Sequence, residues 1–424
     1  MWFPNRVSST VARSGSGILL ATCLAFLQLP VSADTDQSTL INELQQQILA
    51  LTKRITVLEQ SGNDNPETPA IISQPSAQAV MLQPGKPSWS DRIRVKGDVR
   101  SRYENIDDEL KPEDRNRHRV RARVLVETDL SERWSAGIGF ASGGSSPIST
   151  NQSLGNGGTT KALGLDLAYI NFALSDSLII SSGKFKNPFY RVENYHMVWD
   201  SDYRPEGFAF NYNHKNFWAT GMVHFLESDN GSGSKDSETS YGLQTGISHP
   251  ISQNTDLTAG LSYYQFNVQG SSRFFPASVP GNSFTSNGTY ANNYQQLELF
   301  TEVSTFLGGL PITGFIDYVN NLDVSNQDTA WAVGLKLGKA SAARSWELAY
   351  RYQELEADAL YAAITDSDFA GGRTDNTGHI IQAAYAPYKN TKLSLKYFIA
   401  EYGKHNTGVW IDHNRLQVDM SLKF

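Results

Sequence analysis

The residues of this 424-residue chain that could do chemistry form a ladder of charged side chains between positions 92 and 123. In its first half every second residue is charged, and in its second half every second residue is arginine. The basic members are Arg92, Arg94, Lys96, Arg100, Arg102, Arg117, Arg119, Arg121 and Arg123. A regular row of cations could bind nucleic acid, an anionic membrane surface, or small anions inside a pore.

The element that must position this ladder is a pair of β-strands. Apolar residues such as Val95, Val99 and Val120 alternate with the charged ones. A period of two places the charged and the apolar side chains on opposite faces of a strand. Two such strands joined by a polar connection predict an antiparallel hairpin with one basic face.

The composition argues against nucleic acid as the partner. The formal net charge is −7, whereas nucleic-acid-binding proteins are usually basic. The mean hydropathy of −0.38 resembles that of a soluble protein. It is a poor guide for a membrane β-barrel, because barrel strands place an apolar residue only at every second position. We therefore expect no nucleic-acid partner.

Residues 1–33 have the pattern of a cleaved signal peptide. Two arginines precede an apolar stretch at 17–29, and the small residues at 31–33 form a cleavage site. The apolar stretch is too short for a transmembrane anchor. A lipoprotein modified at Cys23 is an alternative, but the threonine before that cysteine fits the lipoprotein pattern badly.

Residues 34–60 carry an a/d heptad pattern, which predicts a periplasmic coiled coil. Its expected contact residues are Ile41, Leu44, Ile48, Leu51, Arg54, Ile55, Leu58 and Glu59. Isoleucine at a with leucine at d favours a dimer by the simple rule. The segment RITVLE, however, resembles a short pattern of trimeric coiled coils, so we favour a homotrimer. One amphipathic helix on another surface is the alternative, and residues 61–90, rich in Pro, Ser, Gln and Asn, are a linker.

Residues 91–424 predict an all-β domain, a transmembrane antiparallel β-barrel of about 16 strands. Short alternating segments recur along this stretch, and it contains no run of 18 apolar residues that could form a transmembrane helix. Its connections alternate between short turns and long loops. Outer-membrane barrels have short periplasmic turns and long extracellular loops, whereas a soluble β-sandwich predicts no such alternation.

The last predicted strand ends in Phe424 and has an apolar residue at every second position before it. A terminal phenylalanine on an amphipathic strand resembles the assembly signal of outer-membrane barrels. Aromatic side chains near strand ends, namely Tyr103, Trp134, Tyr169 and Trp346, would form the belts at the membrane interfaces. We therefore expect this domain in the outer membrane of a Gram-negative bacterium, in contact with lipid and lipopolysaccharide.

Four stretches of the domain resemble the putative porin family of Gram-negative bacteria, in its coiled-coil-bearing group. They are RVKGDVR at 94–100, STNQSL at 149–154 with DLAY at 166–169, GKFKNPF at 183–189, and WDSDYRPEG at 199–207. The likeness covers the barrel domain and is strongest in its first third. It implies a passive diffusion channel and implies little about the substrate, because family members are mostly defined by sequence.

In a barrel, the ladder has to face the lumen. One arginine on the lipid face at mid-bilayer costs about 2–4 kcal/mol, and eight of them could not be tolerated. On adjacent strands they would form a basic wall that attracts anions and repels cations. Acidic side chains expected on the lumen face could offset this charge; they are Asp98, Glu127, Glu298, Glu302 and Asp317. The pattern leaves open both weak selectivity and a real preference for anions.

Residues 187–205 are too aromatic and too charged for an ordinary exposed loop. The candidate constriction residues are Phe189, Tyr190, Arg191, Glu193, Tyr195, Trp199, Asp200, Asp202 and Arg204. One hypothesis is that this loop folds into the lumen and narrows the pore. The alternative is a lid over the mouth of the barrel.

Catalytic and metal-binding patterns are weak. The histidines are scattered. The acidic clusters at 107–109 and 200–202 could bind calcium or bridge lipopolysaccharide, but solvated loop carboxylates are the favoured interpretation, so we expect no metal, no cofactor and no enzyme. A barrel enzyme would need a Ser/His or Asp/His site, for which His224 and His379 are candidates without a clear partner. The remaining alternative is a structural anchor that reaches peptidoglycan through its coiled coil.

Overall fold

The computed structural model describes residues 46, 92–228, 238–272 and 281–424. The expected signal peptide, the linker and all of the coiled coil except Gln46 lie outside the described residues. The unit that contains the strands spans Gln83–Phe424. Among the described residues, no helix is long and apolar enough to cross a membrane.

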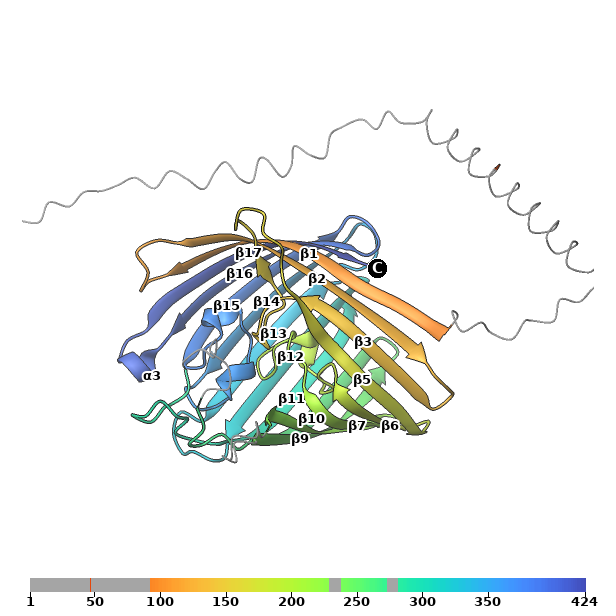
Figure 1. Cartoon of the computed structure of the whole chain (residues 1–424), viewed down its shortest axis with the longest axis horizontal. Helices are drawn as coiled ribbons and strands as arrows, with labels where there is room; N and C mark the ends of the chain where they lie inside the picture. The colour runs from red at the N-terminus through yellow and green to blue at the C-terminus, as the bar shows by residue number, and fades with distance from the viewer. Residues whose placement is uncertain (1–45, 47–91, 229–237, 273–280) are drawn as a thin grey trace, which may run out of the picture. The chain divides into compact units, whose positions relative to one another are not determined.

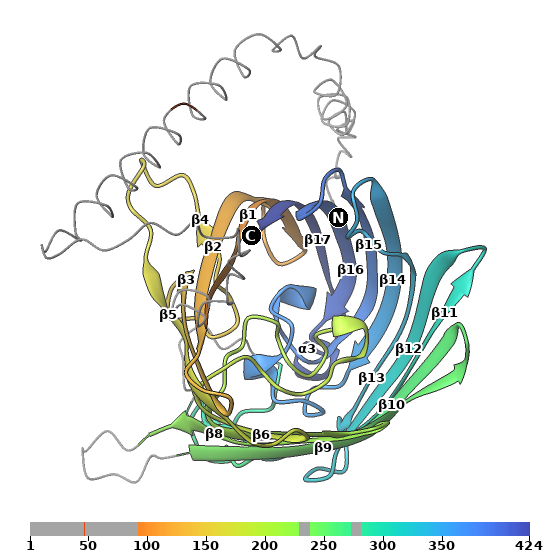
Figure 2. The same cartoon turned by 90° about the vertical axis from the view of Figure 1, so that its right-hand side faces the viewer.

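The architecture is a closed antiparallel β-barrel (Figure 1, Figure 2). Its strands are β1 (Ile93–Asp108), β2 (Arg115–Asp129), β3 (Trp134–Ser142), β4 (Gln152–Ser153), β5 (Leu163–Ser175), β6 (Leu178–Lys184), β7 (Glu206–His214), β8 (Phe217–Glu227), β9 (Glu238–Ser252), β10 (Thr255–Phe266), β11 (Tyr294–Leu307), β12 (Leu310–Asn321), β13 (Thr329–Gly338), β14 (Ser345–Leu355), β15 (Asn376–Ala386), β16 (Thr391–Tyr402) and β17 (Ile411–Lys423). The two-residue β4 pairs with β2, and the other sixteen close the ring. The prediction of an all-β barrel of about 16 strands is confirmed.

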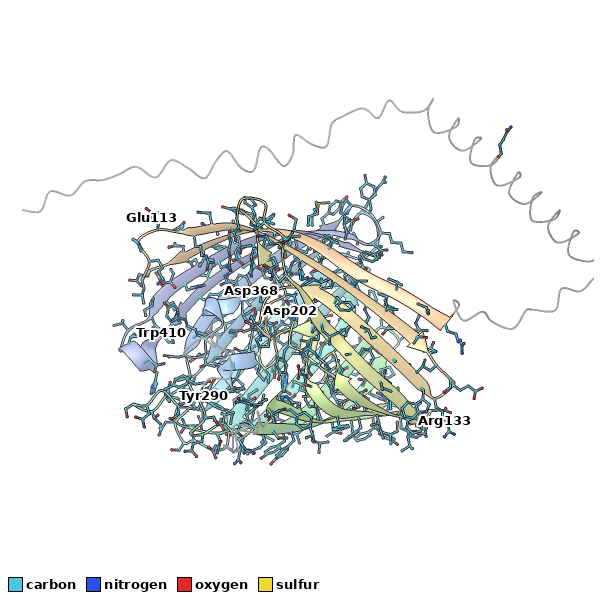
Figure 3. The ribbon with its side chains drawn as sticks, viewed as in Figure 1. Glu113, Arg133, Asp202, Tyr290, Asp368 and Trp410 are labelled. Atoms are coloured by element: carbon cyan, nitrogen blue, oxygen red, sulfur yellow. The ribbon has the colours of Figure 1, made fainter. Side chains whose placement is uncertain are left out.

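The short helices all belong to the loops. They are η3 (Val192–Asn194), η4 (Ala362–Ile364), η5 (Phe369–Gly371) and α3 (Lys404–Thr407). Long loops gather at one end of the barrel, where Figure 3 labels Glu113 and Trp410, and short turns gather at the other, where it labels Arg133. Gly308 and Gly309 form one short turn with φ values of 57° and 83°. A two-residue hairpin turn of this type needs positive φ at both central positions, which glycine provides without strain.

The barrel closes where the last strand meets the first. Beyond the ladder of β1 and β17, the backbone N–H of Gly97 donates to the Phe424 carbonyl at 2.9 Å, and the N–H of Phe424 donates back at 3.1 Å. A Cβ atom on Gly97 would lie 2.3 Å from the Phe424 ring. Glycine at position 97 therefore leaves the space in which the terminal aromatic ring packs.

One local prediction is wrong. The sequence pattern places Leu165, Leu167 and Tyr169 on one apolar face, with Tyr169 in an interfacial belt. The register of β3 against β5 shifts next to Gly139, so that Leu165 is 54% exposed and Leu167 only 3%. Tyr169 instead donates a 2.8 Å hydrogen bond to Glu127 in the interior. A bulge has this effect because a shift of one residue exchanges the two faces of a strand.

Two long loops fold into the ring of strands instead of projecting from it (Figure 2). The first lumen loop, residues 185–205, connects β6 to β7, and the second lumen loop, residues 356–375, connects β14 to β15. Buried apolar residues from both loops and from the barrel wall form one hydrophobic cluster. The interior of this barrel is therefore partly packed like the core of a soluble domain.

Candidate pore lining and lumen loops

The charged ladder lies on one side of the barrel interior, on β1 and β2, and β17 pairs with the other edge of β1. Arg100 lies opposite Arg121 and Arg102 opposite Arg119 across the β1–β2 pair. On the other edge of β1, Arg102 lies opposite Asp419 of β17. Residues directly opposite each other in an antiparallel pair share a face of the sheet. We call this set of inward-pointing residues on the three strands the basic wall.

Most charges of the basic wall are paired. The Arg102 guanidinium donates two hydrogen bonds of 2.7 Å to the Asp419 carboxylate. Arg121 and Arg123 both contact Asp98, at 2.8 Å and 2.7 Å. Such charge-assisted contacts fix the orientation of a guanidinium group as well as its position. The middle of the ladder is therefore an ordered ion-pair network.

Two arginines of the basic wall have no close carboxylate among the described residues. The nearest carboxylate oxygen to Arg100 belongs to Asp419 at 3.8 Å, and the nearest to Arg119 belongs to Glu104 at 3.9 Å. Their shorter contacts are hydrogen bonds to neutral side chains of residues 149–151. These two guanidinium groups give the wall positive charge beyond its close ion pairs.

The remaining members of the ladder lie toward the strand ends. Arg92 is exposed just before β1, and Arg94 and Lys96 form exposed ion pairs with carboxylates of β2. Arg117 pairs with the fully buried Glu104. Exposed ion pairs contribute little to stability, so the buried centre of the ladder is the part with the strongest electrostatic effect.

The opposite side of the interior is aromatic. We call it the aromatic wall; its residues are Tyr264 and Phe266 of β10, Tyr294 and Phe300 of β11, and Phe315 of β12. Trp199 of the first lumen loop is 1% exposed, and its ring meets Tyr264 edge-on with 5.2 Å between centroids. Phe189 packs on the same tyrosine at 4.9 Å. Aromatic pairs of this geometry stabilise beyond their buried area, so this wall holds the loop by packing.

Charged contacts fix the next part of the first lumen loop. Glu193, with a φ of 51°, accepts hydrogen bonds from Lys336 and, at 2.5 Å, from Arg351. The backbone N–H of Glu193 in turn donates to Glu302. Tyr195 donates to Gln353 of β14. The loop is thus attached to β11, β13 and β14 through groups that lie inside the barrel.

Asp202 joins the first lumen loop to the basic wall. Its carboxylate lies 3.2 Å from Arg123 and 3.7 Å from Arg121, and it accepts two hydrogen bonds from Thr150. Burial alone would raise the pKa of Asp202, but the two arginines and the Thr150 N–H lower it to about 2. Asp202 therefore carries a negative charge at neutral pH and links the first lumen loop to the basic wall.

Asp200 has the opposite environment, because it faces the second lumen loop. Its N–H donates to the Ile364 carbonyl at 2.7 Å, and its carboxylate accepts the Ser367 N–H at 2.9 Å. Burial, followed by repulsion from Asp202 and Asp366, raises the pKa of Asp200 well above its ordinary value. The pKa values of these two carboxyl groups are thus shifted in opposite directions, because Asp202 has two arginines within ion-pair distance and Asp200 has none among the described residues.

The second lumen loop also reaches the basic wall. Asp368 lies 3.2 Å from Arg102 and 2.9 Å from Arg415 of β17. Figure 3 labels Asp202 and Asp368 within the ring of strands, away from both ends of the barrel. The sequence pattern predicts long loops in general, and this prediction missed the contact of this one with the lumen. Its signal was the apolar stretch ALYAAI, which does not alternate and is unusual in an exposed loop.

The expected acidic lining is divided between different environments. Glu298 and Asp317 are each 5% exposed, and Glu298 accepts hydrogen bonds from Ser262 and Tyr264 within the aromatic wall. Glu302 lines a cavity beneath the first lumen loop. Asp98 and Glu127 instead pair with members of the basic ladder. No continuous acidic surface faces the basic wall among these residues.

Two cavities lie on either side of the first lumen loop, and both are lined by Asn187 and Arg191. The first, of about 590 Å³, lies against the basic wall, and its other lining residues include Lys186 and Arg204. The second, of about 580 Å³, lies beside β11, β12 and β13. The loop therefore separates two spaces within the barrel.

The residues considered for catalysis have other contacts. His224 is buried, with Nδ1 3.2 Å from the Tyr203 hydroxyl, and His379 contacts Tyr350. In the described ranges, no group of three or more His, Cys, Asp or Glu side chains is arranged to hold a metal ion.

A closed antiparallel barrel with a charged interior and inward-folded loops defines a class of protein, the outer-membrane channel. The family described as "Putative porin" matches residues 109–298 and 282–424. The chain belongs to this family and is a porin, an outer-membrane β-barrel channel. No curated protein matches the sequence.

Several solved porin structures are similar to this chain. OprB of Pseudomonas putida, in a high-pH structure, is similar with a TM-score of 0.53 at 12% identity, over 79% of this chain and 95% of that chain. A Rhodopseudomonas blastica porin triple mutant has a TM-score of 0.47 at 11% identity, over 78% and 100%. Salmonella typhi OmpF, in complex with daunomycin, has a TM-score of 0.48 at 11% identity, over 78% and 97%. At such identities the likeness to OprB extends to the fold alone.

Proposed function

We propose that this porin carries small hydrophilic solutes by passive diffusion and that it prefers anions. The charge of the cavity against the basic wall carries this proposal. Eight lysines and arginines line it, against the two carboxylates Asp98 and Asp166. Cations lining a passage bounded by low-dielectric walls concentrate anions and repel cations. Anions are therefore expected to pass this side of the lumen more readily than cations do.

The first lumen loop is the proposed constriction. It crosses the interior from the aromatic wall, where Trp199 is buried, to the basic wall, where Asp202 meets Arg123. A loop held at both sides narrows the cross-section available to a solute. This arrangement favours a constriction over a lid at the barrel mouth.

Planar-bilayer recording of the purified full chain tests both parts of the proposal. We expect discrete current steps. In a KCl gradient we expect a reversal potential that is shifted from zero toward the equilibrium potential of chloride. Current steps with a reversal potential at zero or on the potassium side would overturn the anion preference.

A structural anchor is the second candidate, because the two lumen loops pack with the aromatic wall into a hydrophobic core. A barrel filled in this way could anchor a periplasmic N-terminal coiled coil to the membrane without conducting ions. The same recording separates the two functions, since an anchor without a pore gives no current steps at any voltage.

The expected assembly is a homotrimer formed through the coiled coil at residues 34–60, with export by a cleaved signal peptide. The segment RITVLE within the heptad pattern supports the trimer, and the exposed apolar side chains of the strands support contact with lipid and lipopolysaccharide. Chemical crosslinking of the full chain, compared with a chain lacking residues 34–60, tests this. Trimers that persist without the segment would exclude the coiled coil as their cause, and co-sedimentation with peptidoglycan would test the tether.

A further inference from the structure

The cavity against the basic wall, which we call the basic cavity, is built from two sides. The first lumen loop contributes Lys186, Asn187 and Arg191, and the barrel contributes Arg100 of β1 and Lys423 of β17, among others. Its volume of about 590 Å³ would hold a small organic solute together with part of its hydration shell.

Several hydrogen-bond donors of the basic cavity have no acceptor among the described residues. Nε of Arg100 and Nδ2 of Asn187 are buried and unpaired. A buried donor without an acceptor is costly, so these two atoms favour an occupant that brings acceptors. Lys186 and Lys423 are exposed and take part in none of the ion pairs of the described residues, and Arg191 donates only a 3.4 Å hydrogen bond to a backbone carbonyl, so these three side chains add positive charge to the cavity.

The two carboxylates of the cavity are already satisfied. Asp98 binds Arg121 and Arg123, and Asp166 lies 3.3 Å from Arg204. The unpaired groups of this cavity are therefore donors and cations. Such a lining matches an oxyanion, which supplies only acceptors and negative charge.

The second cavity provides an internal comparison. Its charged lining consists of three basic residues, Arg191, Lys336 and Lys339, and three acidic ones, Glu193, Asp256 and Glu302. Glu193 already accepts hydrogen bonds from Lys336 and from an arginine of β14. This balance gives the second cavity no comparable excess of positive charge, although it has nearly the same size.

We propose that the basic cavity is a binding site for compact oxyanions that carry two negative charges, such as dicarboxylates or phosphate groups. Two charges are favoured because cations without close carboxylates face the cavity from both the lumen loop and the barrel wall. The inference rests on the proposed anion-preferring channel and names the class of solute that the channel would retain longest.

Calorimetric titration of the full-length protein in detergent tests binding without requiring conduction. The probes are succinate, inorganic phosphate at a pH where it is dianionic, and acetate as the monovalent control, all at equal ionic strength. We expect saturable binding of succinate, of phosphate or of both, and at least about tenfold weaker binding of acetate, because it can satisfy only one side of the cavity. Comparing the first two probes distinguishes carboxylate from phosphate recognition. Acetate binding as tightly as both divalent probes would overturn the proposal.

A matched pair of variants locates the site. The double variant Lys186→Gln with Lys423→Gln removes two cations of the basic cavity that form no ion pair, so the barrel should fold normally. It should weaken divalent binding by about tenfold or more. The control Lys339→Gln with Lys389→Gln removes the same net charge from the second cavity and from an exposed turn. Equal loss in both variants would mean a general charge effect and would refute the site.

Bilayer recording separates this proposal from the proposed function. If the protein conducts, succinate or phosphate should reduce the chloride current saturably in the unaltered chain and less in the double variant. Binding detected by calorimetry in a protein that gives no current steps would overturn the proposed channel function and would support the binding site. Current steps in a protein that does not bind succinate or phosphate would overturn the binding site and would support the channel.

Discussion

The basic wall and the aromatic wall face each other across one barrel, and they hold the lumen loops by different physics. Trp199 and Phe189 pack on aromatic rings in an environment close to that of a protein core. On the other side, Asp202 and Asp368 reach arginines through ion pairs. Packing against aromatic rings is insensitive to salt and pH, whereas the ion pairs depend on the charge of two carboxylates.

The two walls therefore have separable roles. The aromatic wall determines where the loops sit, because its buried area is large and its contacts are apolar. The basic wall has more positive groups than close partners, since Arg100 and Arg119 lack a near carboxylate. Position is therefore expected to respond to changes in the aromatic wall, and ion preference to changes in the basic wall.

The largest effect should come from removing the loop that joins the two walls. Deletion of residues 190–200 removes the Trp199 contacts with the aromatic wall and the Glu193 ion pairs, and it should increase single-channel conductance by about twofold or more because the cross-section widens. Deletion of residues 155–159, an exposed stretch of a different loop, is the matched control and should leave conductance unchanged. Unaltered conductance after the first deletion would contradict the constriction.

Charge reversal in the basic wall should change ion preference without moving the aromatic contacts. With Arg119→Glu and Arg121→Glu together, the reversal potential in a KCl gradient should shift toward potassium, because two cations of the wall become anions. The single variant Arg119→Gln removes a charge without a close ion pair and should shift it less. The control Arg94→Glu changes an exposed pair near the strand end and should have the smallest effect. A reversal potential that none of these variants alters would separate the basic wall from the conduction path.

Truncation in the aromatic wall region should loosen the loop and spare ion preference. Trp199→Ala leaves a space among Phe189, Tyr264 and Phe266, and such truncations cost about 3–5 kcal/mol in well-packed cores. Hydrogen exchange of amides in residues 185–205 should then accelerate. Trp410→Ala, which changes a partly exposed ring at the long-loop end, is the control. Unchanged exchange in the Trp199 variant would show that the loop is held by the ion pairs instead.

The smallest effect should be a pH dependence of the contact between the loop and the basic wall. The pKa of Asp202 is lowered from 3.8 to about 2. A carboxyl group with a lowered pKa stabilises the folded contact fully above its ordinary pKa, by about 2 kcal/mol here, and loses this contribution as the pH falls from about 4 to about 2. Protection of the loop amides, measured as the intrinsic exchange rate divided by the observed rate, should therefore fall as the pH decreases over this range.

Two substitutions distinguish the roles of the Asp200 and Asp202 carboxyl groups in the first lumen loop. Asp202→Asn should abolish the pH dependence and loosen the loop at neutral pH. Asp200→Asn should loosen it little, because burial already raises the pKa of Asp200 and favours its neutral form. A larger loss in the Asp200 variant than in the Asp202 variant would reverse this assignment of roles.

Much of the fold could be predicted because strand and turn signals are local. The alternation around Arg100 and Arg121 identifies the face of each strand, and the lipid on the other face leaves the lumen as the only place for arginine. The failure at Leu167 and Tyr169 has an equally local cause, since one bulge inverts the faces and no composition signal marks it. The prediction also identified residues 187–205 as a loop of unusual composition.

A period of two and the cost of charge in lipid act residue by residue, so they were enough to predict the barrel, its strand count and the basic face. The partners of the basic face depend on the tertiary fold. Whether Arg102 faces water, Asp419 or Asp368 depends on residues more than 260 positions away in the chain. Contacts at such separations are set by barrel closure and loop packing, so no local pattern records them.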